Sequence, residues 1–303
     1  MITILGPTAT GKTAFAALIA HRLDGEVISA DSRQVYKGMN IGTGKDYDDY
    51  IIKGEKIPCH LIDIVDPGYE YNIFEYQAGF LKAYHAIVSR NKLPVLCGGT
   101  GLYIESVLKG YKMVKVPVDK EKRKILETKN DTELTEYLAS FRSLHNITDT
   151  SDRERLIRAI EIQEYYHNHP ELITSFPAIK SDLFGIFFER QIIRRRITTR
   201  LEQRLKEGMI DEVNSLIDNG VAPGKLKFYG LEYKFITQYL LGEIGYDGMF
   251  EKLNTAIHQF AKRQMTWFRK MERSGFKIHW IDGELTDEDK FGIVLKYMKI
   301  NSN

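Results

Sequence analysis

Gly6-Pro7-Thr8-Ala9-Thr10-Gly11-Lys12-Thr13 is the stretch that decides the fold of this chain of 303 residues. A short apolar run, residues 2–5, precedes it, and residues 14–20 follow it with the composition of a helix. An apolar strand, a glycine-containing turn and a helix that starts with Lys and Thr together form one supersecondary unit of an α/β protein. We therefore expect the first strand to end at this turn and the first helix to begin directly after it.

The same turn predicts an anion-binding site. Its spacing is that of a P-loop, in which backbone N–H groups surround a phosphate. The N-terminus of the following helix adds its positive end, and Lys12 adds a full charge. Thr13 offers a hydroxyl to a Mg²⁺ ion. A nucleoside triphosphate is the usual ligand of a P-loop, but the loop alone does not identify the phosphate that residues 6–13 bind.

Composition excludes several classes of protein. A chain with 43% hydrophobic and 28% charged residues is typical of soluble globular proteins, and the net charge of +2 does not by itself predict a nucleic-acid partner. Cys59 and Cys97 have no metal-ligand spacing, which favours a reducing compartment. No apolar run approaches the ~20 residues that span a bilayer, and Met1 lies directly before the first strand, without room for a signal peptide. We expect a cytoplasmic protein with no membrane partner.

Two further strands are predicted to end in polar residues near the P-loop. Residues 26–30 form an apolar run that ends at Asp31, and residues 93–97 form one that leads to Gly98-Gly99-Thr100. Ligands of open α/β sheets bind beyond the carboxyl ends of the strands, so Asp31 and Thr100 are candidate site residues. Each also fits the plainer role of a helix N-cap. A nucleotide hydrolase would have a metal-holding Asp at such a strand end, so the Gly-Gly-Thr sequence weakens that interpretation.

The segment between these strands predicts three elements. Residues 37–45 form a glycine-punctuated loop with two lysines, which we expect to be exposed. Residues 60–66 predict a strand that ends at Pro67. Residues 71–86 have the apolar spacing of an amphipathic helix.

The middle of the chain changes character. Residues 113–182 are rich in charged, helix-favouring residues and lack the strand–turn–helix rhythm of the first part. We therefore predict a helical insertion over residues 113–182, within a catalytic core formed by residues 1–112 and 183–303. Arg155 and Arg158 are three residues apart and share one helix face. That face is either a solvated surface or an edge that contacts phosphates.

Two strongly basic helices are predicted in the last third of the chain. Residues 189–206 contain six arginines, and three of them are consecutive, at 194–196. Some of these must face solvent or an anion, which favours a polyanionic partner. A second basic helix covers residues 259–273 and includes Trp267 and Phe268. These rings could stack on bases, although we favour a core position for Trp267.

This set of motifs resembles the tRNA dimethylallyltransferase (tRNA isopentenyltransferase, IPP transferase) family, bacterial type. The matching blocks occur in family order at residues 6–13, 31–36, 41–45, 60–63, 98–103, 152–161, 196–200, 208–213 and 261–269. The resemblance implies a P-loop NTPase-like parallel sheet flanked by helices. It also implies transfer of a dimethylallyl group from dimethylallyl diphosphate to N6 of adenine 37, 3′ to the anticodon, in tRNAs that read codons beginning with U. Mg²⁺ would be the cofactor, the tRNA anticodon stem-loop the partner, and the protein a monomer.

The resemblance further implies roles for individual residues. The P-loop would hold the pyrophosphate, with Mg²⁺ held partly by Thr13, and Arg200 would contact the same pyrophosphate. Asp31 would act as general base, and Thr100 would orient the amine or the diphosphate. The residues expected to contact tRNA are Asp31, Ser32, Arg33, Gln34, Thr100, Arg123, Glu154, Arg155, Leu156, Ile157 and Arg158.

The chain departs from the family pattern at three places. It has Gly230-Leu231-Glu232 where the family often has Gly-Tyr-Arg or Gly-Tyr-Lys, and Ile257-His258-Gln259 in place of Thr-Arg-Gln. The loop after Lys45 lacks the usual Pro. We expect these departures to lie in tRNA-facing or core-supporting segments, not in the catalytic blocks.

Three alternative functions stay open. An adenylate isopentenyltransferase would act on free adenine nucleotides, but the helical insertion and residues 261–269 favour tRNA. A small-molecule P-loop kinase would share the loop, but the basic helices and the Gly-Gly-Thr strand end argue against it. An RNA-binding module with a vestigial P-loop is disfavoured by the intact Lys12, Thr13, Asp31 and Thr100.

Overall fold

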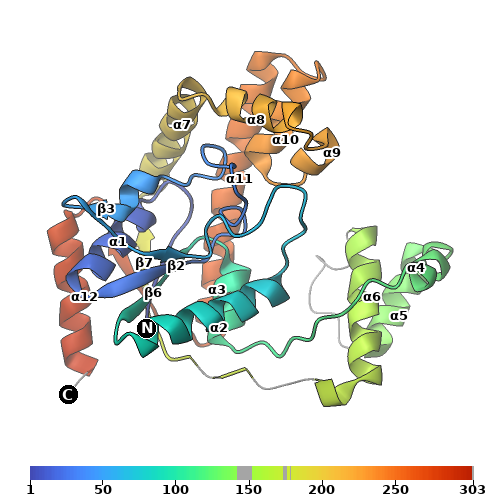
Figure 1. Cartoon of the computed structure of the whole chain (residues 1–303), viewed down its shortest axis with the longest axis horizontal. Coiled ribbons are helices and arrows are strands. Elements are labelled where there is room, and N and C mark those ends of the chain that lie inside the picture. Colours follow the sequence, from blue (N-terminus) through green and yellow to red (C-terminus); the bar gives the residue numbers. More distant parts are fainter. Residues whose placement is uncertain (142–151, 173–175, 178, 302–303) are drawn as a thin grey trace. The chain divides into compact units, whose positions relative to one another are not determined.

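The computed structural model describes residues 1–141, 152–172, 176–177 and 179–301. It divides into two compact units (Figure 1). The larger unit comprises Met1–Lys109 and Ala178–Asn303, and the smaller one is Gly110–Pro177. These boundaries lie a few residues from the insertion expected over residues 113–182. Each unit has its own hydrophobic core.

The larger unit is built on a six-stranded sheet with the order β5-β2-β6-β1-β7-β8, in which every pairing is parallel. The strands are β1 (Ile2–Leu5), β2 (Gly25–Ser29), β5 (Cys59–His60), β6 (Leu93–Gly98), β7 (Asp182–Phe187) and β8 (Ile278–Asp282). A parallel sheet is buried on both faces, which explains why its strands are continuous apolar runs in the sequence. The predicted parallel sheet flanked by helices is confirmed.

Helices cover both faces of this sheet (Figure 1). On one face, α1 (Lys12–Arg22) and α12 (Asp287–Asn301) pack in a core that includes Phe15, Ile4 and Val95. On the other face lie α2 (Ile73–Ser89) and α3 (Gly101–Leu108), whose Tyr76 and Tyr103 rings stack with centroids 3.9 Å apart. A small antiparallel ribbon, β3 (Ile51–Ile52) with β4 (Glu55–Lys56), follows the short helix η1 (Tyr47–Tyr50).

A second helical layer follows β7. It consists of α7 (Arg190–Lys206), α8 (Met209–Asp218), α9 (Pro223–Leu226), α10 (Leu231–Leu240) and α11 (Tyr246–Arg273), which gather on one side of the unit in Figure 1. Their core contains Tyr233 and Leu253, both fully buried. The two basic helices expected from the sequence are confirmed as α7 and α11, and α11 begins well before the expected residue 259. This layer brings α7 and α11 to the P-loop.

Two local expectations are wrong. The strand expected over residues 60–66 ends at His60, because Leu61 and Asp63 have φ values of 63° and 54°, in the left-handed region that breaks a strand. The loop 37–45, expected to be exposed, buries Met39 completely and leaves Lys45 only 4% exposed. Lys45 Nζ donates to the Asp63 carboxylate and to the Tyr36 carbonyl, so burial of its charge is compensated.

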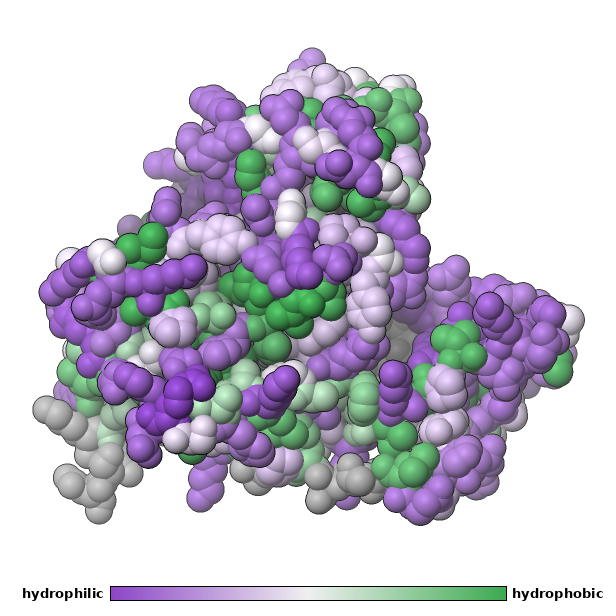
Figure 2. Space-filling view, viewed as in Figure 1, coloured by the Kyte–Doolittle hydropathy of each residue, from purple (hydrophilic) through white to green (hydrophobic). Residues whose placement is uncertain are grey.

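The smaller unit is helical, with α4 (Lys120–Glu127), α5 (Asp131–Phe141), α6 (Arg153–Asn168) and the short η3 (Pro170–Leu172). Leu126, Leu134, Leu138 and Leu156 form its core. The molecular face in Figure 2 is mostly hydrophilic. Across the described parts of both units, no helix combines the length and apolar character needed to cross a bilayer.

Candidate active site at the P-loop

The P-loop turns tightly between β1 and α1. Gly11 has a φ of 74°, which favours glycine, and a Cβ at Gly6 would lie 2.8 Å from the Ile186 carbonyl oxygen. The Thr10 hydroxyl donates to the Pro7 carbonyl at 2.9 Å and closes the loop. Thr13 is half-buried in the first turn of α1. The two glycines are therefore required by the geometry, as the motif predicts.

Positive charge concentrates at this loop. Lys12 Nζ lies 3.4 Å from the Pro7 carbonyl oxygen. Burial lowers the pKa of the Lys12 ammonium, Asp31 opposes this effect, and Arg200 and Arg204 lower the pKa further. Lys12, Arg200 and Arg204 thus place three cationic side chains near the loop, which an anionic ligand would help to neutralise.

Two residues of the helical layer hold the loop in place. Gln264 of α11 accepts a hydrogen bond from the Thr8 N–H and donates one to the Gly99 carbonyl, both at 2.9 Å. Arg196 of α7 donates to the Ala9 carbonyl at 2.9 Å. Sequence reasoning missed the role of Gln264. The available signal was a polar residue on the apolar face of a helix, within the block 261–269.

Asp31 and Thr100 lie side by side at the ends of β2 and β6. The Thr100 N–H donates to the Ala30 carbonyl, and the Thr100 hydroxyl accepts from the Ser32 N–H, both at 3.2 Å. Asp31 Oδ1 accepts from the Arg33 N–H at 2.9 Å. The helix-cap alternative is wrong for Asp31, because no helix of the described residues begins there. Thr100 does occupy the N-cap position of α3, but its hydroxyl makes no cap hydrogen bond.

The residues after Asp31 differ in their accessibility. Gln34 is 8% exposed, accepts from the Ser29 hydroxyl and donates to the Gly44 carbonyl, both at 3.0 Å. Its side chain therefore fixes the loop around Gly44. Ser32 and Arg33 are half-buried and lie next to Asp31.

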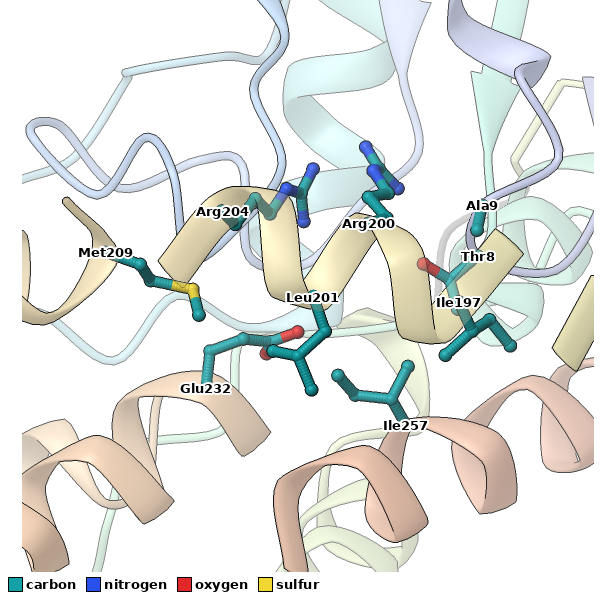
Figure 3. A pocket seen from close by; sticks show the side chains of 9 residues that line it. All are labelled: Thr8, Ala9, Ile197, Arg200, Leu201, Arg204, Met209, Glu232 and Ile257. Carbon is teal, nitrogen blue, oxygen red and sulfur yellow. The ribbon is translucent and has the colours of Figure 1, made fainter. Parts of the chain in front are cut away.

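Arg200, expected at the pyrophosphate, is bound to a carboxylate in this structure. Arg200 donates to Asp46 at 2.5 Å, and Arg204, one helical turn away, donates to the same carboxylate at 3.2 Å. Burial alone would raise the pKa of Asp46, but the two guanidinium groups hold it below its ordinary value. Arg200 also lines a small pocket with Thr8 and Ala9 (Figure 3), so it lies within reach of the P-loop.

The departures from the family pattern lie against α7, the helix that carries Arg200. Asp46, in the position after Lys45, binds Arg200 itself. Glu232 and Ile257 line the pocket of Figure 3, and burial raises the pKa of the Glu232 carboxyl. His258 Nε2 lies 3.3 Å from the Thr198 hydroxyl. The departures therefore lie outside the blocks expected to carry the chemistry, although Asp46 contacts the candidate catalytic residue Arg200.

The structure separates the expected tRNA-contacting residues of the insertion into two groups. Arg123 and Arg158 both donate to Glu161, whose side chain is 2% exposed. Leu156 and Ile157 are buried, so their side chains pack inside the unit. Glu154 and Arg155 are exposed. The Arg155 side chain is 64% exposed, and its Nε lies 4.0 Å from the Asp152 carboxylate.

Two family models match this chain. Residues 34–271 match the model described as IPP transferase, and residues 1–59 match the model described as isopentenyl transferase. The chain belongs to the IPP transferase family.

Relatives support this membership over nearly the full length. The chain is 56% identical to tRNA dimethylallyltransferase 2 of Bacteroides fragilis, over 99% of this chain and 98% of that protein. It is 53% identical to tRNA dimethylallyltransferase 1 of Parabacteroides distasonis, over 98% and 97% of the two chains.

Solved structures of the IPP transferase family share the fold. The tRNA isopentenylpyrophosphate transferase of Bacillus halodurans matches with a TM-score of 0.71 and 31% identity, covering 98% of this chain and 95% of that one. A eukaryotic dimethylallyltransferase matches in fold with a TM-score of 0.79 at 22% identity, covering 100% and 80%. The P-loop NTPase-like fold expected from the sequence is confirmed.

Proposed function

We propose that this chain transfers a dimethylallyl group from dimethylallyl diphosphate to N6 of an adenine in tRNA. Its family and the names of its relatives support a tRNA prenyltransferase. The observation that carries the chemistry is the arrangement around the P-loop. Lys12 and Arg200 provide cations for a diphosphate, and Asp31 and Thr100 stand where a nucleotide hydrolase would hold a metal-binding carboxylate.

The leaving group is the first part of the mechanism. Backbone N–H groups of residues 6–13, the ammonium of Lys12 and the guanidinium of Arg200 would bind the diphosphate. They would neutralise the charge that develops as the carbon–oxygen bond to the dimethylallyl group breaks. Arg200 must turn from Asp46 toward the P-loop to do so.

Magnesium fits this site as a ligand of the diphosphate. In the described residues no group of three or more His, Cys, Asp or Glu side chains could hold a metal ion by itself. Mg²⁺ commonly binds through few protein ligands together with phosphate oxygens and water. Thr13, half-buried in the first turn of α1, would supply the protein ligand. When bound, the ion would neutralise charge on the departing diphosphate.

The acceptor amine is the second part. The adenine cannot react while stacked, so it would be extruded into the site. Its N6 would attack the first carbon of the dimethylallyl group, and Asp31 would take the N6 proton as general base. Thr100, fixed against Ser32, would orient the amine or the diphosphate.

The finer substrate assignment comes from the family resemblance. We propose that the target is adenine 37, 3′ to the anticodon, in tRNAs that read codons beginning with U. Ser32 and Arg33, next to Asp31, would contact neighbouring nucleotides of the anticodon stem-loop. We further propose that the enzyme is a cytoplasmic monomer.

The direct test is incubation of the protein with unmodified tRNA, Mg²⁺ and dimethylallyl diphosphate, followed by mass analysis of the nucleosides. We expect N6-isopentenyladenosine in the tRNA. Two control reactions separate the alternatives: ATP in place of the diphosphate reports a kinase, and AMP in place of tRNA reports an adenylate isopentenyltransferase. Absence of the modified nucleoside from tRNA, with turnover in either control, would replace the proposed function.

A further inference from the structure

The contact between Asp46 and the arginines of α7 is an ion pair beside the proposed diphosphate site. The Asp46 carboxylate accepts hydrogen bonds from Arg200 at 2.5 Å and from Arg204 at 3.2 Å. Since the arginines hold its pKa below the ordinary value, Asp46 carries a full negative charge at neutral pH. A diphosphate and Asp46 therefore offer Arg200 the same kind of anionic partner.

The two arginines are held to different degrees. The Arg204 side chain is 11% exposed, and its guanidinium lies so close to Gly44 that a Cβ there would be 2.5 Å from it. The Arg200 side chain is 31% exposed and the Asp46 side chain 44%, so water reaches their contact. A partly exposed pair of this kind is weak and exchanges readily. Arg204 can hold Asp46 while Arg200 turns away.

Arg200 is also electrostatically coupled to the P-loop. It lines the same pocket as Thr8 and Ala9 (Figure 3), and its charge lowers the pKa of Lys12. The guanidinium therefore binds the Asp46 carboxylate and lies close enough to the P-loop to affect the pKa of Lys12.

We infer that Asp46 is a positioning residue that competes with the diphosphate for Arg200 and thereby promotes release of inorganic diphosphate after transfer. The inference rests on the proposed function, because it requires a diphosphate at the P-loop. In the free protein Asp46 binds Arg200, and in the complex Arg200 binds the diphosphate while Arg204 keeps Asp46. Removal of the Asp46 charge takes away the competing anion.

The test is the affinity of the full chain for inorganic diphosphate with Mg²⁺, measured by calorimetry. We expect Asp46→Asn to bind about tenfold more tightly than the unmodified protein, because the carboxylate that competes for Arg200 is removed. Inorganic diphosphate should also inhibit its transfer reaction at about tenfold lower concentration. Asp48→Asn is the matched control, since it removes an exposed carboxylate two residues away on η1, and its affinity should stay within about twofold.

The outcomes separate this inference from the proposed function. Unchanged or weaker diphosphate binding by Asp46→Asn would overturn the competition, and the same result with Asp46→Ala would do so if the Asn variant failed to fold. An equal gain in Asp48→Asn would reduce the effect to general electrostatics and would also overturn it. If the unmodified protein does not bind diphosphate, the proposed function itself fails.

Discussion

The two units of this protein each contain one carboxylate bound by two arginines, and the two clusters differ in burial. In the smaller unit, Glu161 is 2% exposed and binds Arg123 and Arg158. In the larger unit, Asp46 is 44% exposed and binds Arg200 and Arg204. The first cluster joins α4 to α6 within a helical core, and the second lies beside the P-loop.

This difference shows how burial changes the role of the same chemical group. A buried carboxylate that loses its arginines becomes a buried, unpaired charge, so the Glu161 cluster is held together by a large penalty for opening. A half-exposed carboxylate can be solvated by water when an arginine leaves. The Glu161 cluster therefore stabilises the fold, and the Asp46 cluster can exchange partners during a reaction.

Substitution of Asp31 is expected to have the largest effect on the transfer reaction. Asp31 lies near the P-loop. Its carboxylate accepts a hydrogen bond from the Arg33 backbone N–H, not from a side chain, and can therefore accept one from an amine as well. We expect Asp31→Ala to lower the single-turnover rate of transfer by about 10²- to 10⁴-fold, the usual contribution of a positioned general base. Binding of dimethylallyl diphosphate, measured by calorimetry, should survive. Near-normal turnover would remove Asp31 from the mechanism.

Arg200→Ala should lower activity, whereas the corresponding substitution in the Glu161 cluster should lower stability. We expect kcat/KM for transfer to fall by about 10²- to 10³-fold, as when one donor to a developing anion is lost. Thermal unfolding should change little, because the deleted ion pair is partly exposed. Arg158→Ala is the counterpart in the smaller unit, and it should lower thermal stability more than Arg200→Ala does. The reverse pattern would contradict the assignment of the two clusters.

Glu161→Gln should act on stability. We expect the free energy of unfolding of the smaller unit to fall by about 2 kcal/mol, because two charged hydrogen bonds to a buried carboxylate are weakened. Hydrogen exchange in the full chain measures the loss unit by unit. Glu136→Gln is the control, since it removes an exposed carboxylate from α5 of the same unit. Equal protection from hydrogen exchange in the two variants would show that Glu161 contributes no more to stability than an exposed carboxylate does.

The same residue predicts an acid dependence. Burial alone would raise the pKa of Glu161, but hydrogen bonds from Arg123 and Arg158 outweigh burial, so the folded-state pKa lies below the ordinary value of 4.5. The stabilisation is therefore present above pH 4.5 and is lost as the pH falls through the lowered pKa. Below that range, wild type and Glu161→Gln should have similar stability in the smaller unit. A gap that persists at low pH would contradict the ion-pair explanation.

The smallest effect concerns the exposed arginine of the smaller unit. The Arg155 side chain is 64% exposed, and its Nε lies 4.0 Å from the Asp152 carboxylate. If it contacts a tRNA phosphate, Arg155→Ala should reduce the slope of log affinity against log salt by about 1, and Arg155→Lys should retain it. Filter binding of unmodified tRNA at several salt concentrations measures the slope. An unchanged slope would leave Arg155 on a solvated face.

The sequence predicted the elements whose signals are local. Apolar runs identified β1, β2 and β6, because strands buried on both faces need such runs. The spacing of residues 6–13 predicted the P-loop and its glycines. The expected strand at 60–66 failed because the positive φ values of Leu61 and Asp63 leave no composition signal.

Long-range polar contacts could not be predicted. Gln264 bonds to Thr8 across 256 positions of sequence, and Arg200 bonds to Asp46 across 154. Neither pairing has a spacing that local periodicity can detect, because it depends on how the helical layer packs on the sheet. The candidate catalytic residues Asp31 and Thr100 were predictable because strand ends of a parallel sheet converge at one edge.

The central claim is that the P-loop holds a leaving diphosphate and that the bond that breaks is carbon–oxygen. The most direct measurement uses dimethylallyl diphosphate labelled with oxygen-18 at the oxygen that joins carbon to phosphorus. Mass analysis after incubation with tRNA and Mg²⁺ should find the label in the released inorganic diphosphate and a label-free dimethylallyl group on adenine N6. Label in dimethylallyl alcohol, or phosphate transferred to the acceptor, would contradict the account.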